Sequence, residues 1–490
     1  MNRQNAYEMV IGLETHVELR TQSKIFCSCP NAFGAEPNTH VCPVCMGLPG
    51  ALPVMNAEAL RLAAKAGLAL NCQVHHRSRF DRKNYFYPDL PKAYQISQFY
   101  HPLCERGSLT VETEKGEKRI GITRIHIEED AGKLTHDVKS GTGVDMNRCG
   151  VPLIEIVSEP DIRSAEEAVA YLRKLRAILT YAGVSDCRMN EGSMRCDVNL
   201  SVRKPGEALG VRTEMKNLNS FQSVERAIAA EFARQTEALE AGEPVVQETR
   251  RYDQKTGKTT SMRRKENSAD YRYFPDPDLP EICLTDGEME KLRAEIPALP
   301  DERRKRYMSL YGLTAYAAEQ LAAELWLAEY FETAAKKAQN PTALANLLLG
   351  EAFALISLRE GGQSGERGRG SLPVAPEHLA RLSDLMSEGR VNSSTGKKIL
   401  AAMFDRDCDP AAYAREHDLY VLTDESALQR AVEQTLARNP DLASAYRGGK
   451  TGVEKALMGR AMAETKGKAD PGKLRFLLMK ALDEGRRSTE

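Results

Sequence analysis

The sequence has no long apolar run, no excess of charge of either sign and no internal repeat at a fixed period. A membrane-spanning helix needs about 18 apolar residues in a row, and no stretch approaches that length. The first residues lead into a strand-like segment rather than an apolar signal region. The 68 basic and 69 acidic residues give a net charge of -1, so a polyanion must be met by a local patch. We expect a cytoplasmic protein outside the membrane.

Two common nucleotide-binding motifs are also absent. No segment matches G-x-x-x-x-G-K-S/T, because Ser444 stands where the first glycine should precede Gly449-Lys450-Thr451. No G-x-G-x-x-G fingerprint occurs either. If the protein uses ATP, an unfamiliar kind of site must hold it.

The chain of 490 residues is too long for one compact core, so we expect several domains. Strand-like alternation dominates its first part, with one helix over Ser164–Thr180. Alanine- and leucine-rich helical periodicity begins near Pro300. This pattern predicts an α+β fold: a large mixed-sheet domain over 1–295, a helical domain over 296–412 and a small helical tail domain over 413–490.

Four of the eleven cysteines form two closely spaced pairs around a turn-rich loop: Cys27, Cys29, Cys42 and Cys45. In a chain without an export signal, cysteines are more often thiols or metal ligands than disulfides. Four thiolates on two tight turns predict a tetrahedral Zn²⁺ site with no open position. Ordinary free thiols are the alternative. A closed site of this kind stiffens a loop and leaves no place for a substrate.

Several acidic residues stand in strand-like segments. Alternation within Gly12–Leu19 gives one apolar face and one polar face that presents Glu14, His16 and Glu18. An amphipathic surface strand would give the same pattern. Glu155, in contrast, interrupts an apolar run, and a buried carboxylate needs a cation or a metal as partner.

A further strand ends in the acidic residues Glu128, Glu129 and Asp130. Carboxylate oxygens suit Mg²⁺, which usually binds substrate phosphates as well. Because neighbouring residues of a strand face opposite sides, spacing alone leaves open whether Glu128 or Glu129 is the ligand.

Long ordered blocks of sequence carry a family resemblance: Gly12–Glu18, Phe80–Asp89, Pro91–Gln98, Leu153–Asp161, Glu191–Asn199, Lys216–Phe221 and Asp270–Pro275. With these blocks the chain resembles the GatB family, the B subunits of the aspartyl/glutamyl-tRNA amidotransferases. The resemblance is dense in the first domain, which it implies is a catalytic cradle, and looser in the others.

The resemblance implies an ATP-dependent enzyme that corrects Glu-tRNA(Gln), Asp-tRNA(Asn) or both. In this family the GatB subunit phosphorylates the side-chain carboxylate of the attached amino acid, and ammonia then displaces the phosphate. The chain has no recognisable glutamine-hydrolysing nucleophile. The family therefore implies a heterotrimer with an amidase subunit, GatA, and a small subunit, GatC.

By motif, the resemblance implies a magnesium and phosphate centre made of four residues: Glu14, His16, Glu129 and Glu155. It adds Glu214 as a further catalytic candidate. Lys83 and Lys92 resemble polar residues of the family's ammonia path, although either lysine could be a solvated surface charge.

The last domain has a basic bias, with five cations as candidate tRNA contacts: Lys450, Lys455, Arg460, Lys466 and Lys468. Helical spacing turns four leucines towards a core and several cations outward: Leu457, Leu474, Leu477 and Leu478. A solvated helix face is the alternative. The family's tail meets the tRNA elbow, which favours RNA contact through phosphates and shape.

Two rival functions follow from the same residues. In a non-catalytic tRNA-binding scaffold, the acids would only pair with buried basic groups. In a zinc hydrolase, the metal would need an open position, which a closed Cys₄ site lacks. The low-complexity segment Gly361–Gly370 is predicted to be a flexible loop, and its composition does not indicate a role.

Overall fold

The computed structural model describes residues 6–138, 141–264, 268–359, 370–422 and 424–487. It divides into two compact units, Met1–Leu299 and Pro300–Glu490. Most of Gly361–Gly370 lies outside the described residues, so the loop expected there stays a prediction.

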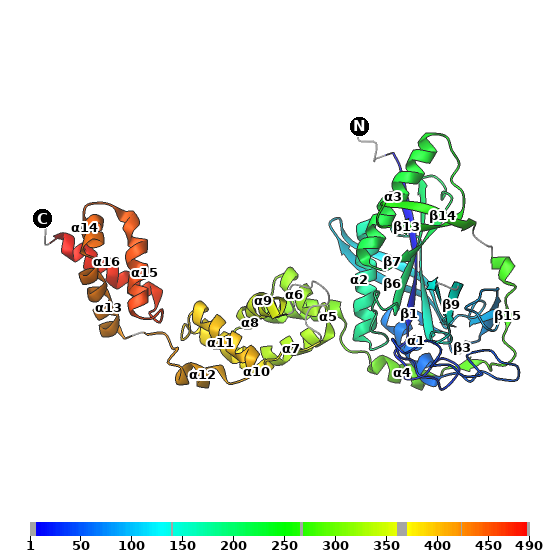
Figure 1. The fold of residues 1–490 in the computed structure, drawn as a ribbon, viewed down its shortest axis with the longest axis horizontal. Coiled ribbons are helices and arrows are strands. Elements are labelled where there is room, and N and C mark those ends of the chain that lie inside the picture. The colour runs from blue at the N-terminus through cyan, green and yellow to red at the C-terminus, as the bar shows by residue number, and fades with distance from the viewer. Residues whose placement is uncertain (1–5, 139–140, 265–267, 360–369, 423, 488–490) are drawn as a thin grey trace. The chain divides into compact units, whose positions relative to one another are not determined.

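The first unit is built on a sheet with nine strands among the described residues: β1 (Glu8–Glu18), β2 (Gln73–Val74), β6 (Cys104–Thr113), β7 (Gly116–Glu129), β10 (Pro152–Ser158), β11 (Met194–Arg203), β12 (Thr213–Leu218), β13 (Glu248–Asp253) and β14 (Lys258–Arg264). Their order is β14-β13-β12-β11-β1-β10-β7-β6-β2. Neighbours run antiparallel except β12 and β13, so the sheet is mixed. Figure 1 shows β1 in the middle of this sheet.

Two helices cover the apolar face of the sheet, α2 (Ala165–Tyr181) and α3 (Phe221–Glu240). Their N-caps, Ser164 and Ser220, each accept a hydrogen bond from a backbone N–H of the first turn. Their buried side chains share one core with Leu13 and Val17 of β1. The polar residues of β1 therefore face the other side of the sheet.

The smaller elements of this unit surround the sheet: α1 (Ala57–Ala69), β3 (Arg77–Ser78), β4 (Asp81–Asn84), β5 (Tyr94–Ser97), β8 (Lys133–Val138), β9 (Gly141–Asp145), η2 (Ser268–Tyr271), β15 (Phe274–Pro275), β16 (Ile282–Cys283) and α4 (Asp286–Ala294). The four clustered cysteines lie in the turns between β1 and α1. Strands β4, β5 and β15 form a separate three-stranded sheet.

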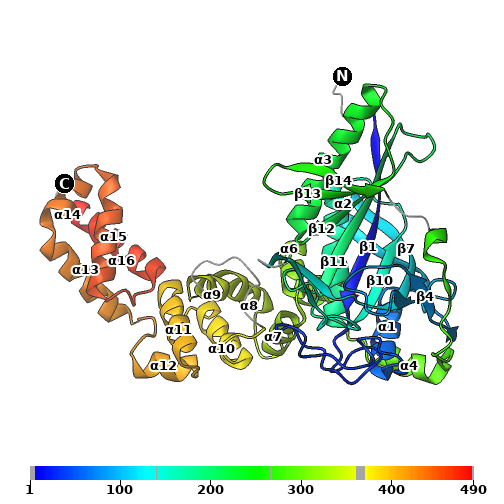
Figure 2. The same ribbon diagram turned by 45° about the vertical axis from the view of Figure 1, so that its right-hand side comes forward.

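The second unit is helical among its described residues: α5 (Pro300–Tyr311), α6 (Ala315–Ala322), α7 (Leu325–Ala335), α8 (Pro341–Leu347), η3 (Leu348–Ala352), α9 (Phe353–Arg359), α10 (Pro376–Ser387), α11 (Ser393–Asp405), α12 (Pro410–Glu416), α13 (Glu425–Arg438), α14 (Pro440–Arg447), η4 (Thr451–Val453), α15 (Glu454–Glu464) and α16 (Pro471–Arg487). The helices α13–α16 surround a core of their own that contains Leu457, Leu474 and Leu478, as predicted, whereas Leu477 is partly buried against this core. Figure 2 shows these four helices together at the C-terminal end.

One continuous helical stretch, Pro341–Arg359, is long and apolar enough to cross a membrane by length and composition, with a mean hydropathy of 1.5. Polar residues such as Asn346 and Glu351 interrupt it, so its apolar residues do not form an unbroken run. A single helix of this kind is weak evidence for a membrane span.

The predicted fold class is confirmed, since a large mixed sheet with helices is followed by a helical region. The predicted helix at Ser164–Thr180 agrees with α2, and the predicted strand at the start agrees with β1. The division into three domains stays a prediction.

Candidate active site

Four side chains from β1, β7 and β10 meet on the polar face of the sheet and form the histidine cluster: His16, His126, Glu128 and Glu155. Strand register places His16 opposite Glu155, and Glu155 opposite His126. His16 Nε2 lies 3.5 Å from Glu155 Oε2 and 3.6 Å from Glu128 Oε1. His126 Nε2 lies 3.3 Å from Glu155 and 3.5 Å from Glu128. Each imidazole therefore contacts both carboxylates.

In the histidine cluster, each imidazole and each carboxylate favours the charged form of the other. Burial by itself lowers the pKa of His16, but the carboxylates of Glu155 and Glu128 outweigh burial and raise this pKa to about 9. Burial also lowers the pKa of His126, but the same two carboxylates outweigh burial and raise this pKa. Burial opposes ionisation of the two acids, yet the two imidazoles lower the pKa of both. At neutral pH both carboxylates are thus ionised and paired with the imidazoles. A metal that binds through His16 must displace its ring proton, because only the neutral imidazole has a lone pair to donate.

Three acids from β1, β11 and β12 form the carboxylate cluster: Glu14, Asp197 and Glu214. One oxygen of each lies within 4.8 Å of the others, since Glu14 stands opposite Asp197 in the register. Asn199 Nδ2 donates to Glu14 Oε1 at 2.8 Å. Lys216 forms an ion pair with Asp197, and its Nζ lies 3.2 Å from Glu214 Oε1. These two neighbours hold the three carboxylates in place.

Both clusters offer ligand atoms that suit a divalent cation. In the histidine cluster, a ring nitrogen of His16 and one oxygen each of Glu128 and Glu155 lie within 4.8 Å of one another. The carboxylate cluster offers oxygen alone, which suits Mg²⁺, whereas an imidazole with two carboxylates also suits transition metals. Glu14 and His16 are two residues apart on β1, so this strand joins the clusters.

Glu129 lies apart from both clusters, in a different setting from its neighbour Glu128. Its carboxylate accepts hydrogen bonds from Lys92 Nζ at 2.7 Å and from the backbone N–H of Ile96 at 2.9 Å. Gln95 Nε2 donates to its carbonyl oxygen at 2.7 Å. The structure places Glu128, not Glu129, beside His16, and magnesium binding by either acid stays a prediction.

The two candidate lysines both have partners within the protein, and Lys83 is half-buried. The side chain of Lys92 is 12% exposed and pairs with Glu129. Lys83 Nζ lies 4.8 Å from the ring centroid of Tyr271 and 5.5 Å from that of Tyr85. Such cation–π contacts fix the ammonium group among aromatic rings.

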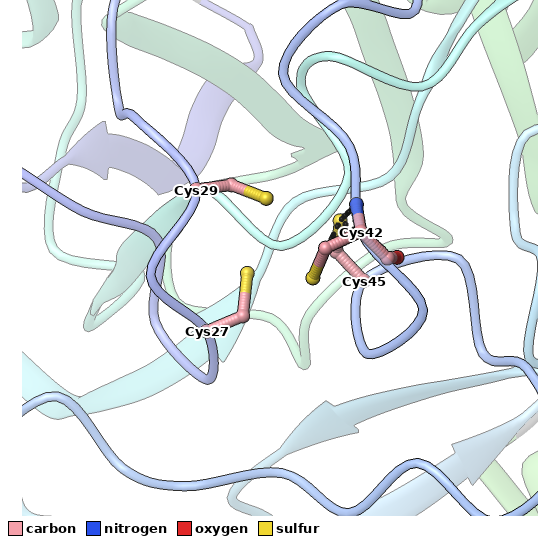
Figure 3. A group of neighbouring side chains, drawn as sticks. All are labelled: Cys27, Cys29, Cys42 and Cys45. Carbon is pink, nitrogen blue, oxygen red and sulfur yellow. Dashed lines mark hydrogen bonds between the residues drawn. The ribbon is translucent and has the colours of Figure 1, made fainter.

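The four cysteine side chains point towards a common centre, as Figure 3 shows, and one sulfur of each lies within 4.8 Å of the others. A hydrogen bond from the Cys27 thiol lowers the pKa of Cys45 to about 4, with help from the backbone N–H of Cys42 and from Lys24, although burial opposes this. The cluster is therefore positioned to bind a metal. Four sulfur ligands are the donor set of structural zinc.

Four of the five tail cations are exposed, namely Lys450, Lys455, Arg460 and Lys466. The fifth, Lys468, is half-buried and forms an ion pair with Asp418. The exposed cations are free to meet solvent or a polyanion, whereas Lys468 has a structural partner.

Two models of known protein families match this chain. A family model described as the GatB/GatE catalytic domain matches residues 9–290, and one described as the GatB domain matches residues 329–482. The chain belongs to the GatB family.

Two relatives show how far this GatB similarity extends. The chain is 51% identical over 480 residues to the B subunit of the aspartyl/glutamyl-tRNA(Asn/Gln) amidotransferase of Caldicellulosiruptor saccharolyticus, a match that covers 98% of this chain and 99% of that protein. The corresponding protein of Nitratidesulfovibrio vulgaris is 50% identical over 482 residues, or 97% and 99% of the two chains. The similarity therefore spans nearly the whole of each protein.

The GatB catalytic match covers both clusters and the cysteines, and the second match covers the tail cations. Sequence reasoning did not assign His126, Asp197 or Lys216 to the site. Alternation within each strand puts these residues on polar faces. Only the pairing of distant strands shows that these faces coincide.

Proposed function

We propose that this chain is the GatB subunit of a tRNA-dependent amidotransferase, and that it uses ATP to activate the side-chain carboxylate of Glu-tRNA(Gln), Asp-tRNA(Asn) or both. The names of the relatives give the amidotransferase class. The observation that supports the activation step is the convergence of two metal-binding clusters on one sheet face, joined through Glu14 and His16. Phosphoryl transfer depends mainly on such positioning and charge stabilisation.

The proposed reaction has two steps. An oxygen of the substrate carboxylate attacks the γ-phosphorus of ATP, and ADP leaves. Ammonia then attacks the acyl carbon of the acyl phosphate, phosphate leaves, and the nitrogen gives up a proton to form the amide. Bound Mg²⁺ would supply neutralisation of the charge on the transferred phosphoryl group.

The residues of the two clusters would bind the cations, and a neighbouring residue would orient the ligands. The carboxylate cluster would hold one cation, and His16, Glu128 and Glu155 would hold another. His126 contacts Glu128 and Glu155 from the buried side and so orients them. Outer contacts of this kind fix the direction of ligand atoms and tune their affinity.

Ammonia is proposed to arrive past Lys92 and Lys83 from an amidase partner, GatA, in a heterotrimer completed by GatC. The names of the relatives describe one lettered subunit of an enzyme, which supports an assembly of several subunits. The cytoplasm, where aminoacyl-tRNA is used, is the proposed location.

The tRNA is proposed to reach both parts of the chain. We propose a catalytic domain over 1–295, a helical domain over 296–412 and a tail over 413–490 whose exposed cations contact tRNA phosphates. Near the clusters, Tyr273 stacks on Phe99 with ring centroids 4.1 Å apart. Aromatic faces with neighbouring cations suit the unpaired bases at the end of a tRNA.

The test is a pair of isosteric substitutions, Glu14→Gln and Glu155→Gln, in the reconstituted complex. Each removes one carboxylate ligand of a different cluster without changing side-chain size. We expect ATP-dependent activation of mischarged tRNA, measured as ADP release, to fall by roughly a hundredfold or more. Binding of the tRNA should stay within about twofold.

Glu159→Gln serves as the control, because Glu159 follows β10 and is exposed. It should leave ADP release unchanged. If Glu14→Gln and Glu155→Gln both behave like this control, the acids are not catalytic, and the chain is a non-catalytic tRNA-binding scaffold.

A further inference from the structure

The turn that contains two of the cysteines is pressed directly against Lys92. Gly47 ends this turn with φ +64°, and a Cβ placed there would lie 2.4 Å from Lys92 Cγ and 3.3 Å from Lys92 Cα. The turn is closed by its own hydrogen bonds, from the N–H of Met46 to the carbonyl of Cys42 and from the N–H of Gly47 to the carbonyl of Val44. No side chain fits between this turn and Lys92.

The partner of Lys92 is in close contact with the same cysteines through a second glycine. A Cβ placed on Gly150, whose φ is +79°, would lie 3.5 Å from Cys45 Cβ and 4.0 Å from Glu129 Oε2. The carbonyl of Gly150 accepts a hydrogen bond from Ile25 in the cysteine loop, and its N–H donates to Asp130, next to Glu129. Both members of the ion pair are thus packed against the cysteine site.

A buried lysine joins the cysteine site to the surrounding chain. Lys24 is fully buried, and its Nζ donates to the carbonyl of His40 at 2.7 Å and to Cys45 Sγ at 3.6 Å. It also lies 3.4 Å from the carbonyl of Met146, close to Gly150 in the chain. An ammonium group placed in this way compensates the negative charge of metal-bound thiolates.

The cysteine turn and the ion pair line the same cavity, which has a volume of about 140 Å³. Its wall includes Val44, Cys45 and Gly47 of the turn and both members of the ion pair, together with Phe26. A shift of the turn would therefore change the cavity and the position of the ion pair together.

We propose that the metal-bound cysteine turn, Cys42–Gly47, positions the Lys92–Glu129 ion pair and the cavity beside it, and so controls delivery of ammonia to the activated carboxylate. This inference rests on the proposed function. The metal site would then do more than stabilise its loop. Its occupancy would determine the position of Lys92 and Glu129, which lie outside the metal site. Such coupling is reciprocal. If bound metal strengthens the ion pair by some factor, the ion pair must raise the affinity for the metal by the same factor.

The first test measures this reciprocity without any catalytic assay. The variant Lys92→Met removes the ion pair and keeps an unbranched chain against Gly47. We expect the dissociation constant for zinc, measured on the full chain by competition with a chromophoric chelator, to rise by at least about fivefold. Lys115→Met, at an exposed lysine, is the control and should leave it unchanged. Equal zinc affinity in both variants would overturn the coupling.

The second test compares Gly47→Ala with Gly50→Ala in the complete complex, prepared with zinc. Gly50 lies in the same loop with φ +81°, but a Cβ there meets nothing within 4 Å, so it reproduces the backbone strain without the clash. We expect Gly47→Ala to retain ADP release and to lower the amide formed per ADP by roughly tenfold or more. Gly50→Ala should keep the wild-type ratio.

The outcomes separate this inference from the function on which it rests. Equal ratios in the two glycine variants, or a loss of ADP release in parallel with amide, would overturn the positioning role. If the unmodified complex releases no ADP with mischarged tRNA, the proposed function fails instead. The zinc competition then still decides whether the turn and the ion pair are coupled.

Discussion

At the scale of single residues, the adjacent acids Glu128 and Glu129 illustrate how strand geometry separates roles. They follow each other in β7, so their side chains leave the strand on opposite sides. Glu128 meets His16, and Glu129 meets Lys92. Two consecutive residues thus belong to different proposed sites, Glu128 to the metal site and Glu129 to the ammonia path.

Another single residue, Glu231, allows a prediction about stability and pH. This fully buried acid of α3 accepts hydrogen bonds from Arg234 Nη2 at 2.6 Å and from the hydroxyls of Thr213 at 2.8 Å and Thr259 at 2.7 Å. Burial opposes its ionisation, but its hydrogen-bond partners outweigh burial and lower the pKa of Glu231 below its ordinary value of 4.5.

We expect Glu231→Gln to lower the free energy of unfolding of the first unit by about 3 kcal/mol at pH 7. A lowered folded-state pKa gives stability that is complete above the unfolded value and is lost as the pH falls through the folded value. The difference from wild type should therefore shrink below about pH 4. Denaturant unfolding between pH 3 and 7 measures this, with the exposed Glu237→Gln on the same helix as the control. A difference that grows towards acid pH would contradict the ionised role.

At the scale of elements, the cysteine loop depends on its ligand set because it has little regular structure. Its described residues before α1 form turns and one isolated bridge, between Ser23 and Pro30. The neighbouring strands have complete ladders of hydrogen bonds and their own apolar core. Metal binding should therefore stabilise the loop far more than the sheet.

We predict about one zinc per chain by metal analysis, and its loss in Cys42→Ser. Removal of zinc by a chelator should speed amide hydrogen exchange in the loop 27–53 and leave β1 and β10 unchanged. Cys283→Ser, at an exposed cysteine outside the cluster, should retain the metal. Unaltered exchange in the loop after complete zinc removal would show that the cysteines stabilise nothing there.

At the scale of the whole molecule, the tail forms a folded part with its own core and an exposed set of cations. The prediction of RNA contact belongs to this scale, because a tRNA is large enough to touch regions of the chain that are remote in sequence. The structure refines the place for a truncation. A cut after His417 preserves α12, whereas a cut at residue 412 would divide that helix.

We expect the chain truncated after His417 to bind tRNA more weakly and with a smaller dependence on salt, because each lost phosphate contact lowers the slope of log affinity against log salt by about 0.9. Binding at several salt concentrations measures this. The triple variant of Lys450, Lys455 and Arg460 to alanine removes charge while sparing the tail's core, and it should lower the slope as well. An unaltered slope in both would contradict tRNA contact by the tail.

Those features that depend on neighbouring residues could be predicted from the sequence. The polar face of β1 with Glu14 and His16, the helix α2 and the cysteine pairs all follow from short spacings. The sequence blocks that resemble the GatB family could also be recognised without the structure. These features are local because side-chain direction repeats every two residues in a strand and about every 3.6 in a helix.

Which of these local faces meet depends on the fold and could not be predicted from short spacings. The pairing of Glu14 with Asp197, the position of Glu128 rather than Glu129 beside His16, and the contact of Gly47 with Lys92 each join segments far apart in the chain. Strand register decides the first two, and a shift of one residue would turn every polar side chain of a strand to the other face. The third depends on close packing between a loop and a lysine stem, which no spacing within either segment records.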